Sequence, residues 1–219
     1  MQTKDNVTIL YYTSNTENQD FENKIRERLK VSAGDIPIVS VSQKPIDLGT
    51  NICVGEVGCS YFNLFRQTLI GLDAIKTPFI TTAEADCLYP KGYFEYIPKE
   101  LDRIYRYDNV WILRKWRSWF FKKDWSGGAM VVGTEYYKSI INKAIKGFPM
   151  WTTAKEPHFY IYGKWGIEKW ETFNGENAVI NIKTMNGLGK DTKTLREIPP
   201  VESLPYWGSA RKLKKELGL

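Results

Sequence analysis

The stretch NLFRQTLIGLDAIKTPFITTAEAD, residues 63–86, decides the fold. Its first half belongs to a predicted helix over residues 61–75, where apolar residues recur at helical spacing. Residues 76–78 end that helix, because their proline disfavours a helical conformation in the residue before it. Residues 79–82 then form a predicted strand, which carries two acidic residues into the loop at its carboxyl end. Ligands bind at this end of the strands in an open α/β sheet, so the loop is the predicted site.

The segments before this stretch alternate between strand and helix. Residues 7–12 are rich in β-branched and aromatic residues, and the polar cluster at 13–16 reads as a loop that can cap a helix. A helix is predicted over 18–30, where apolar residues recur every four positions, and a second strand over 36–41. This order predicts an α/β fold with a central, mostly parallel, Rossmann-like mixed sheet flanked by helices.

The segments after the acidic loop continue the alternation. We expect a helix over 92–106 interrupted at Pro98, strands at 110–113 and 129–132, helices at 134–146 and 156–165, extended segments at 170–173 and 178–182, and a basic tail helix at 209–217. Two glycine-containing loops, at 126–128 and 186–189, lie between these elements and suit close approach of a ligand.

Composition places the chain among ordinary globular proteins. It has 219 residues, of which 42% are hydrophobic and 26% charged, enough for one domain with a sizeable core. No apolar run reaches the roughly 20 residues that span a bilayer, so we expect a cytoplasmic protein, in the host cytoplasm if a virus encodes it. Cys53, Cys59 and Cys87 show neither an even pairing nor a zinc spacing. The net charge of +6 favours an anionic partner.

The acidic loop has a specific chemical capacity. Glu84 and Asp86 are separated by one residue at a strand end, so their carboxylates can face one small volume and hold a hard divalent cation, Mn²⁺ or Mg²⁺. Such a cation stabilises the charge that develops on a leaving diphosphate. Ordinary loop acids show the same short pattern, so the pattern alone leaves both interpretations open.

In its order of elements the chain resembles the GT-A class of glycosyltransferases, especially the family-2-like branch and phage-type enzymes. Residues 7–13 are similar to the first strand of these enzymes, and residues 63–86 to the helix and strand that end at the acidic D-x-D motif. Residues 125–130 are similar to their glycine loop, and residues 156–167 to the Glu-Asp motif with its helix. The resemblance implies one GT-A domain over residues 1–219. It also implies a nucleotide-binding half over about 1–110 and an acceptor-binding half over about 111–219.

The resemblance further implies a nucleotide-sugar donor, with UDP as the expected nucleotide, and assigns residues to it. The donor-binding residues are Thr13, Ser14, Asn15, Arg66, Glu84, Ala85, Asp86, Gly127, Gly128 and Lys183. The metal ligands are Glu84, Asp86 and His158. Glu156 is the general base, which takes the proton of the acceptor hydroxyl in a single, inverting displacement at the anomeric carbon.

The chain departs from the family pattern around that base. Pro157 replaces the second acid of the Glu-Asp pair, and His158 is the single histidine of the chain. Side chains two positions apart on a helix diverge by about 200°, so a helix would point Glu156 and His158 in different directions. If His158 is therefore not a metal ligand, Asn181 or Lys183 would contact the diphosphate instead. If no carboxylate near the acceptor is essential, a retaining route replaces inversion.

A basic and aromatic run over residues 111–125 suggests where the acceptor binds. Its rings can stack on bases or sugars while its cations meet phosphates, as nucleic-acid binding requires. The predicted acceptor-binding residues are Trp116, Arg117, Trp119 and Trp125. A partly buried hairpin with a solvated basic rim explains the run equally well. The acceptor is then either a hydroxymethylated base in phage-type DNA or a carbohydrate.

Two other functions remain open on the sequence. A non-catalytic nucleic-acid-binding protein would use the basic aromatic run and respond to neither metal nor nucleotide sugar. A nucleotidyltransferase would share the sheet and the metal but use a nucleoside triphosphate. The sequence has no glycine-lysine phosphate loop, which argues against a P-loop enzyme. The oligomeric state is not predicted.

Overall fold

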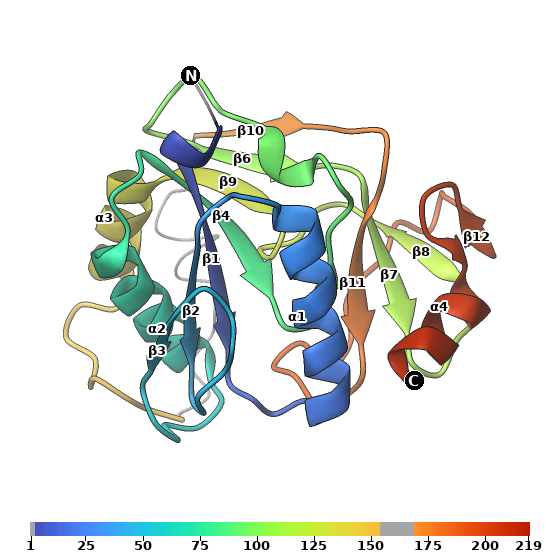
Figure 1. The fold of residues 1–219 in the computed structure, drawn as a ribbon, viewed down its shortest axis with the longest axis horizontal. Coiled ribbons are helices and arrows are strands. Elements are labelled where there is room, and N and C mark those ends of the chain that lie inside the picture. The colour runs from blue at the N-terminus through green and yellow to red at the C-terminus, as the bar shows by residue number, and fades with distance from the viewer. Residues whose placement is uncertain (1–2, 154–168) are drawn as a thin grey trace.

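The computed structural model describes residues 3–153 and 169–219. Its main sheet has seven strands in the order β10-β6-β9-β4-β1-β2-β3 (Figure 1). The pairs β1–β2, β1–β4, β2–β3 and β6–β10 are parallel, while β9 runs antiparallel to β4 and β6. The strands are β1 Val7–Thr13, β2 Ile38–Ser42, β3 Thr50–Cys53, β4 Phe79–Glu84, β6 Ile104–Tyr107, β9 Met130–Gly133 and β10 Trp170–Phe173. The predicted central, mostly parallel mixed sheet is confirmed.

Strand β1 lies between β4 and β2 in the main sheet and is buried along its whole length. Its side chains alternate between two cores, because successive residues of a strand point to opposite faces. Leu10 and Tyr12 pack with α2 (Tyr61–Ala74) and α3 (Thr134–Ala144) on one face. Val7, Ile9 and Tyr11 pack on the other face with α1 (Gln19–Ala33) and the short 3-10 helix η2 (Tyr93–Glu95).

A second sheet, which the sequence did not predict as separate, lies beside the main one. It has four strands in the order β5-β11-β7-β8, where β7 and β11 are parallel. These strands are β5 Cys87–Leu88, β7 Val110–Arg114, β8 Phe120–Lys123 and β11 Val179–Lys183. Apolar residues of α1 and of the tail helix α4 (Ala210–Leu217) share a core with this sheet, so α1 contacts both sheets (Figure 1).

Most predicted elements are present, with one clear error. Residues 92–106 do not form a helix interrupted at Pro98: within this range the chain forms the short 3-10 helix η2 and then strand β6, Ile104–Tyr107, which lies between β9 and β10. The isoleucine and tyrosines of β6 are buried in the sheet. The pairing of β6 with β9 and β10 decides their conformation. The remaining short elements are η1 Thr3–Asp5, β12 Ser203–Leu204 and β13 Gly208–Ser209.

The helix predicted over 156–165 lies outside the described residues. Among the helices that are described, none combines the length and apolar character needed to cross a bilayer.

Gly133 tests how tightly β9 is packed at the start of α3. A Cβ atom at this position would lie 2.0 Å from the carbonyl oxygen of Leu101, and backbone cannot move aside as a side chain can. The φ angle of Gly133 is −61°, which any residue adopts, so alanine adds only the steric conflict. We expect Gly133→Ala to lower the free energy of unfolding by about 1–3 kcal/mol in urea denaturation. Val31→Ala, at a position 81% exposed on α1, is the control and should change it by less than about 0.5 kcal/mol.

Candidate functional site

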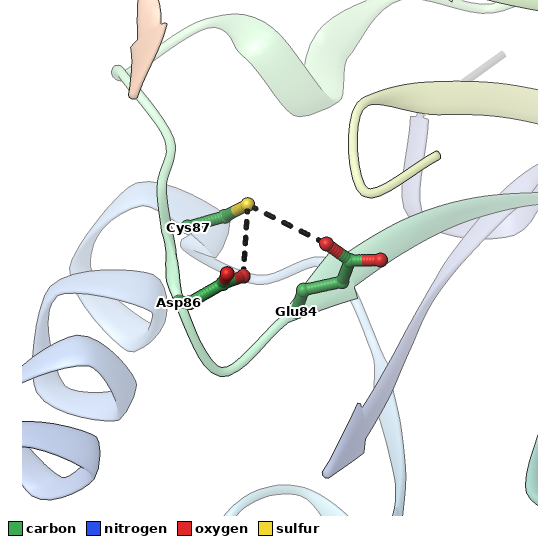
Figure 2. A group of neighbouring side chains, drawn as sticks. All are labelled: Glu84, Asp86 and Cys87. Carbon is green, nitrogen blue, oxygen red and sulfur yellow. Dashed lines mark hydrogen bonds between the residues drawn. The ribbon is translucent and has the colours of Figure 1, made fainter. Parts of the chain in front are cut away.

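The two acids of the predicted loop lie at the carboxyl end of β4. Glu84 is the last residue of β4, and Asp86 lies in the turn that leads to β5. The Cys87 thiol points at both carboxylates, with its Sγ 3.8 Å from Glu84 Oε2 and 3.6 Å from Asp86 Oδ1 (Figure 2). One ligand atom from each of the three residues lies within 4.8 Å of the others. The arrangement therefore forms a compact group of donors that could hold a metal ion.

Strand β11 brings a cation and an amide to Asp86. Lys183 Nζ lies 3.0 Å from Asp86 Oδ2, and Asn181 Nδ2 donates to Asp86 Oδ1 at 3.2 Å. The backbone N–H of Ile182 also donates to the carbonyl of Asp86, at 2.6 Å. Asn181 and Lys183 are both buried. The sequence predicts that Asn181 or Lys183 contacts the diphosphate. That contact stays a prediction, and the structure places both side chains beside Asp86.

Glu84 is held between β1 and the glycine loop. Its Oε1 accepts from the Tyr12 hydroxyl at 3.0 Å. The buried hydroxyl of Tyr89 accepts from the backbone N–H of Glu84 and donates to the carbonyl of Gly128 at 2.6 Å. A Cβ at Gly128 would lie 2.5 Å from Glu84 Oε2, so the glycine backbone covers the carboxylate closely. Thr82 Oγ1 donates to the carbonyl of Gly127 and ties the same loop to β4.

The electrostatics of the site follow from burial and from the close spacing of the acids. Burial raises the pKa of Glu84, and the neighbouring Asp86 raises it further. Burial also raises the pKa of the Cys87 thiol, with Asp86 and Glu84 adding to the effect. Burial alone would lower the pKa of Lys183, but Asp86, Glu84 and Cys87 outweigh it and raise the pKa. Lys183 is therefore cationic at neutral pH beside Asp86.

A second lysine faces the same acids from β8. Burial lowers the pKa of Lys123, and repulsion from Lys183 lowers it further, although Glu84 opposes the change. Two lysines thus act on the two carboxylates, Lys183 through an ion pair with Asp86 and Lys123 through the electrostatic attraction of its charge. Such a balance can accept a metal ion together with an anion, because the added charges offset each other.

The predicted donor residues after β1 form a tightly bonded loop. Thr13 Oγ1 donates to Glu22 Oε1 and accepts from the backbone N–H of Asn15. Asn15 has a positive φ of 53°, and its Oδ1 accepts from the backbone N–H groups of Gln43 and Lys44. Ser14 is partly buried, and its Oγ lies 3.1 Å from the Thr16 hydroxyl. These bonds position the loop at the end of β1, next to the end of β4.

Two other predicted donor residues differ in their surroundings. Ala85 is partly buried between the two acids and packs against the core on the α1 side. The Arg66 guanidinium instead donates to backbone carbonyls of the segment after α3, at Ile145, Phe148 and Pro149. The described contacts of Arg66 thus secure that segment and are not made to Glu84 or Asp86.

The predicted acceptor residues fall into two groups. A groove of about 560 Å³ is lined by Trp116, Arg117 and Trp119 together with Arg114, Phe121, Asp191 and Pro200. Trp125 is not among the residues that line this groove. Its ring stacks under the guanidinium of Arg106, whose central carbon lies 4.2 Å from the ring centroid. The basic aromatic run does form the hairpin β7–β8, as one of the two interpretations of the sequence expected.

Two predicted site residues lie outside the described part of the chain, and four residues at the site were not predicted. Glu156 and His158 lie outside the described residues, so their roles stay predictions. The sequence analysis did not identify Tyr12, Cys87, Tyr89 and Lys123 as site residues. Cys87 directly follows Asp86, and its position next to two acids was the available signal. Tyr89 follows three residues after Asp86, but nothing in that short stretch indicates that its hydroxyl bonds back to Glu84. Tyr12 and Lys123 belong to other segments, so no local pattern reveals them.

No protein-family model and no curated protein sequence matches the chain. Solved structures match its fold. A glycosyltransferase involved in the glycosylation of the major capsid of PBCV-1 aligns with a TM-score of 0.51 and 12% identity, over 98% of this chain and 100% of that one. The inositol-1-phosphate CTP transferase of T. maritima aligns with a TM-score of 0.51 and 12% identity, over 88% and 94%. S. aureus TarS 1-349 in complex with UDP-GlcNAc aligns with a TM-score of 0.50 and 8% identity, over 97% and 66%.

At these identities the likeness concerns the fold. The chain has the GT-A-like α/β fold of these glycosyltransferases and of the CTP transferase, as the resemblance in sequence predicted. Activity, donor and acceptor do not follow from it.

Gly128→Ala tests whether the glycine backbone must cover Glu84. The new Cβ would push against the Glu84 carboxylate, which can rotate away, so we expect the fold to persist while the acidic group is misplaced. Binding of Mn²⁺ in calorimetric titration should weaken by about 10- to 100-fold, as for other groups that orient metal ligands. Gly189→Ala is the control, because its Cβ would make an ordinary 3.5 Å contact with Lys183 Nζ. Equal Mn²⁺ affinity in both variants would contradict this role of Gly128.

Glu84→Gln tests the electrostatic cost of the acid pair. Since the pKa of Glu84 is raised in the folded protein, the folded state binds its proton more tightly than the unfolded state does. Stability therefore falls as the pH rises from the ordinary glutamate pKa of about 4.3 through the raised value. The glutamine variant should be more stable than the wild type at pH 7, by about 2–4 °C in Tm. The difference should disappear near pH 4, and a variant less stable than the wild type at pH 7 would refute the assignment.

Proposed function

We propose that the protein is a metal-dependent glycosyltransferase that transfers a sugar from a UDP-sugar to an acceptor hydroxyl. One observation supports this above all: Glu84 and Asp86 lie together at the carboxyl end of β4, beside the buried cation of Lys183 and under the backbone of Gly128. Ligands bind at this edge of α/β sheets. A diphosphate with its metal ion matches the mixed charges of the site.

The donor atoms at the site fit a divalent cation. Two carboxylates supply the oxygen ligands that Mg²⁺ and Mn²⁺ prefer, whereas the Cys87 thiol is the softer donor. Asn181 also leaves its Oδ1, a further oxygen, without a hydrogen-bond partner among the described residues. We infer that Glu84 and Asp86 are the principal ligands. The ion would neutralise charge on the diphosphate when the glycosidic bond breaks.

The residues of this chain then have separate tasks. Lys183 donates to Asp86 and is close enough to the acids to donate to a diphosphate oxygen as well, so it stabilises the leaving group. Tyr12 and Tyr89 hold the side chain and the backbone of Glu84 in place. Glu156 is the proposed base that takes the proton of the acceptor hydroxyl. The hydroxyl oxygen would then attack the anomeric carbon as the bond to the diphosphate breaks, which inverts the configuration.

The acceptor carries a hydroxyl group, either on a hydroxymethylated base in DNA or on a glycan. The basic aromatic hairpin β7–β8 supports both, since indole rings stack on bases and on sugars. Its arginines and lysines favour a polyanion.

A nucleotidyltransferase is the second candidate, because the fold matches the inositol-1-phosphate CTP transferase as well as it matches the capsid glycosyltransferase. The same acids would then hold the metal of a nucleoside triphosphate. Release of pyrophosphate from a triphosphate would identify this activity, whereas release of a nucleoside diphosphate from a nucleotide sugar identifies the first.

Thermal unfolding with nucleotides tests the donor site. We expect UDP or a UDP-sugar with Mn²⁺ to raise the Tm, since a ligand bound to the folded state stabilises it by about 2.7 kcal/mol at one hundred times its Kd. Asp86→Ala should abolish the rise. Asp47→Ala, which changes a fully exposed acid, should retain it.

A nucleoside triphosphate that raises the Tm more than any nucleotide sugar would favour the nucleotidyltransferase. No response to any nucleotide, with or without Mn²⁺, would contradict both transferase candidates. The nucleic-acid-binding function would then remain.

A further inference from the structure

The groove on the β7–β8 hairpin exposes two indole rings. Trp116 is 45% and Trp119 is 42% exposed, and both line the groove of about 560 Å³. They lie in the turn between β7 and β8, with Phe121 and Pro200 completing the apolar wall. We call this surface, with Arg114, Arg117 and Asp191, the tryptophan groove. Two indole rings that line one groove give a surface on which a planar ligand can stack.

The charge of the tryptophan groove is positive. Its single acid, Asp191, is already paired with Arg114 at 2.8 Å, and the Arg114 guanidinium lies 4.7 Å from the centre of the Phe121 ring. Arg117 is exposed, and Lys214 of α4 reaches the hairpin by donating to the Arg117 carbonyl. Among the described lining residues, the arginines outnumber the acid by two to one. Planar guanidinium groups match phosphate oxygens in pairs of hydrogen bonds.

The tryptophan groove begins next to the acidic site. Arg114, the last residue of β7, is paired in register with Lys183, the last residue of β11. Neighbouring strands lie about 4.8 Å apart, and the two strands are parallel, so both residues end at the same edge. The backbone N–H of Lys115 also donates to the carbonyl of Lys183, at 2.8 Å. A chain that lies in the groove can therefore extend toward Asp86, which Lys183 contacts.

We propose that the tryptophan groove binds single-stranded nucleic acid and presents one nucleotide of it to the acidic site. This inference rests on the proposed function, for which it names the acceptor. The exposed indoles supply faces on which unpaired bases stack, and the arginines supply partners for the phosphates between them. A duplex hides its base faces, so it cannot use the indoles. A neutral glycan could stack on the rings but offers no anion to Arg117, whereas Arg114 already has Asp191 as its partner.

Fluorescence anisotropy with a labelled single-stranded oligonucleotide of mixed sequence tests the groove. The wild type should bind it more tightly than the same sequence as a duplex, with an affinity that falls as salt increases. Trp119→Ala and Trp116→Ala should each weaken binding by about 5- to 100-fold, the value of one stacked base. Trp170→Ala is the matched control, because Trp170 is also half exposed but lies on β10, in the other sheet.

Three results would overturn the inference. One is an equal loss of affinity in Trp119→Ala and Trp170→Ala, and a second is tighter binding of the duplex. The third concerns a sulfated polysaccharide, which carries negative charge but has no bases. The inference is overturned if this polymer competes with the oligonucleotide and its binding depends equally strongly on Trp116 and Trp119. That result would assign the groove to an anionic glycan.

The response of the wild type to UDP and Mn²⁺ separates this inference from the proposed function. Oligonucleotide binding through the groove without any nucleotide response would support the groove and contradict the transferase. A nucleotide response without oligonucleotide binding would leave the transferase supported and the groove inference overturned.

Discussion

Asp86 joins the two sheets, and the arrangement of the site depends on this contact. Its backbone carbonyl accepts from Ile182, and its carboxylate accepts from Asn181 and Lys183, all on β11 of the second sheet. Asp86 itself follows β4 of the main sheet. Three bonds to one residue therefore set where the second sheet meets the first. The ion pair also gives the buried charge of Lys183 a partner, without which its burial would be strongly unfavourable.

The position of the acids could be predicted from the sequence because it depends on local patterns. Helical spacing over residues 61–75, a proline stop and a short apolar strand place an acidic loop at a sheet edge without knowledge of tertiary contacts. The helix predicted over 92–106 was wrong because β6 is defined by its neighbours β9 and β10, which come from residues much later in the chain. The separate second sheet escaped prediction for the same reason. Its strand β5 has only two residues.

The environment of the acids shows what sequence patterns omit. Lys123 belongs to a segment whose own sequence gives no sign of a site, and its charge acts on Glu84 only through the tertiary fold, whereas Tyr89 bonds to Glu84 from five residues further along the same segment. The result is a carboxylate whose pKa is raised by burial and by its neighbour Asp86. Such an arrangement opposes stability in the protein alone, and it is typical of sites that bind or transform a ligand. The acid pair lowers the stability of the free protein, as expected if the proposed metal ion and diphosphate bind there and offset its charge.

The most direct test is anomalous diffraction from crystals grown with Mn²⁺ and UDP. The account predicts one strong manganese peak within coordination distance, about 2.2 Å, of Asp86 and Glu84 oxygens, with the diphosphate between the ion and Lys183. Bound UDP away from this loop, or a loop that remains without manganese when UDP is bound, would contradict the proposed role of Glu84 and Asp86.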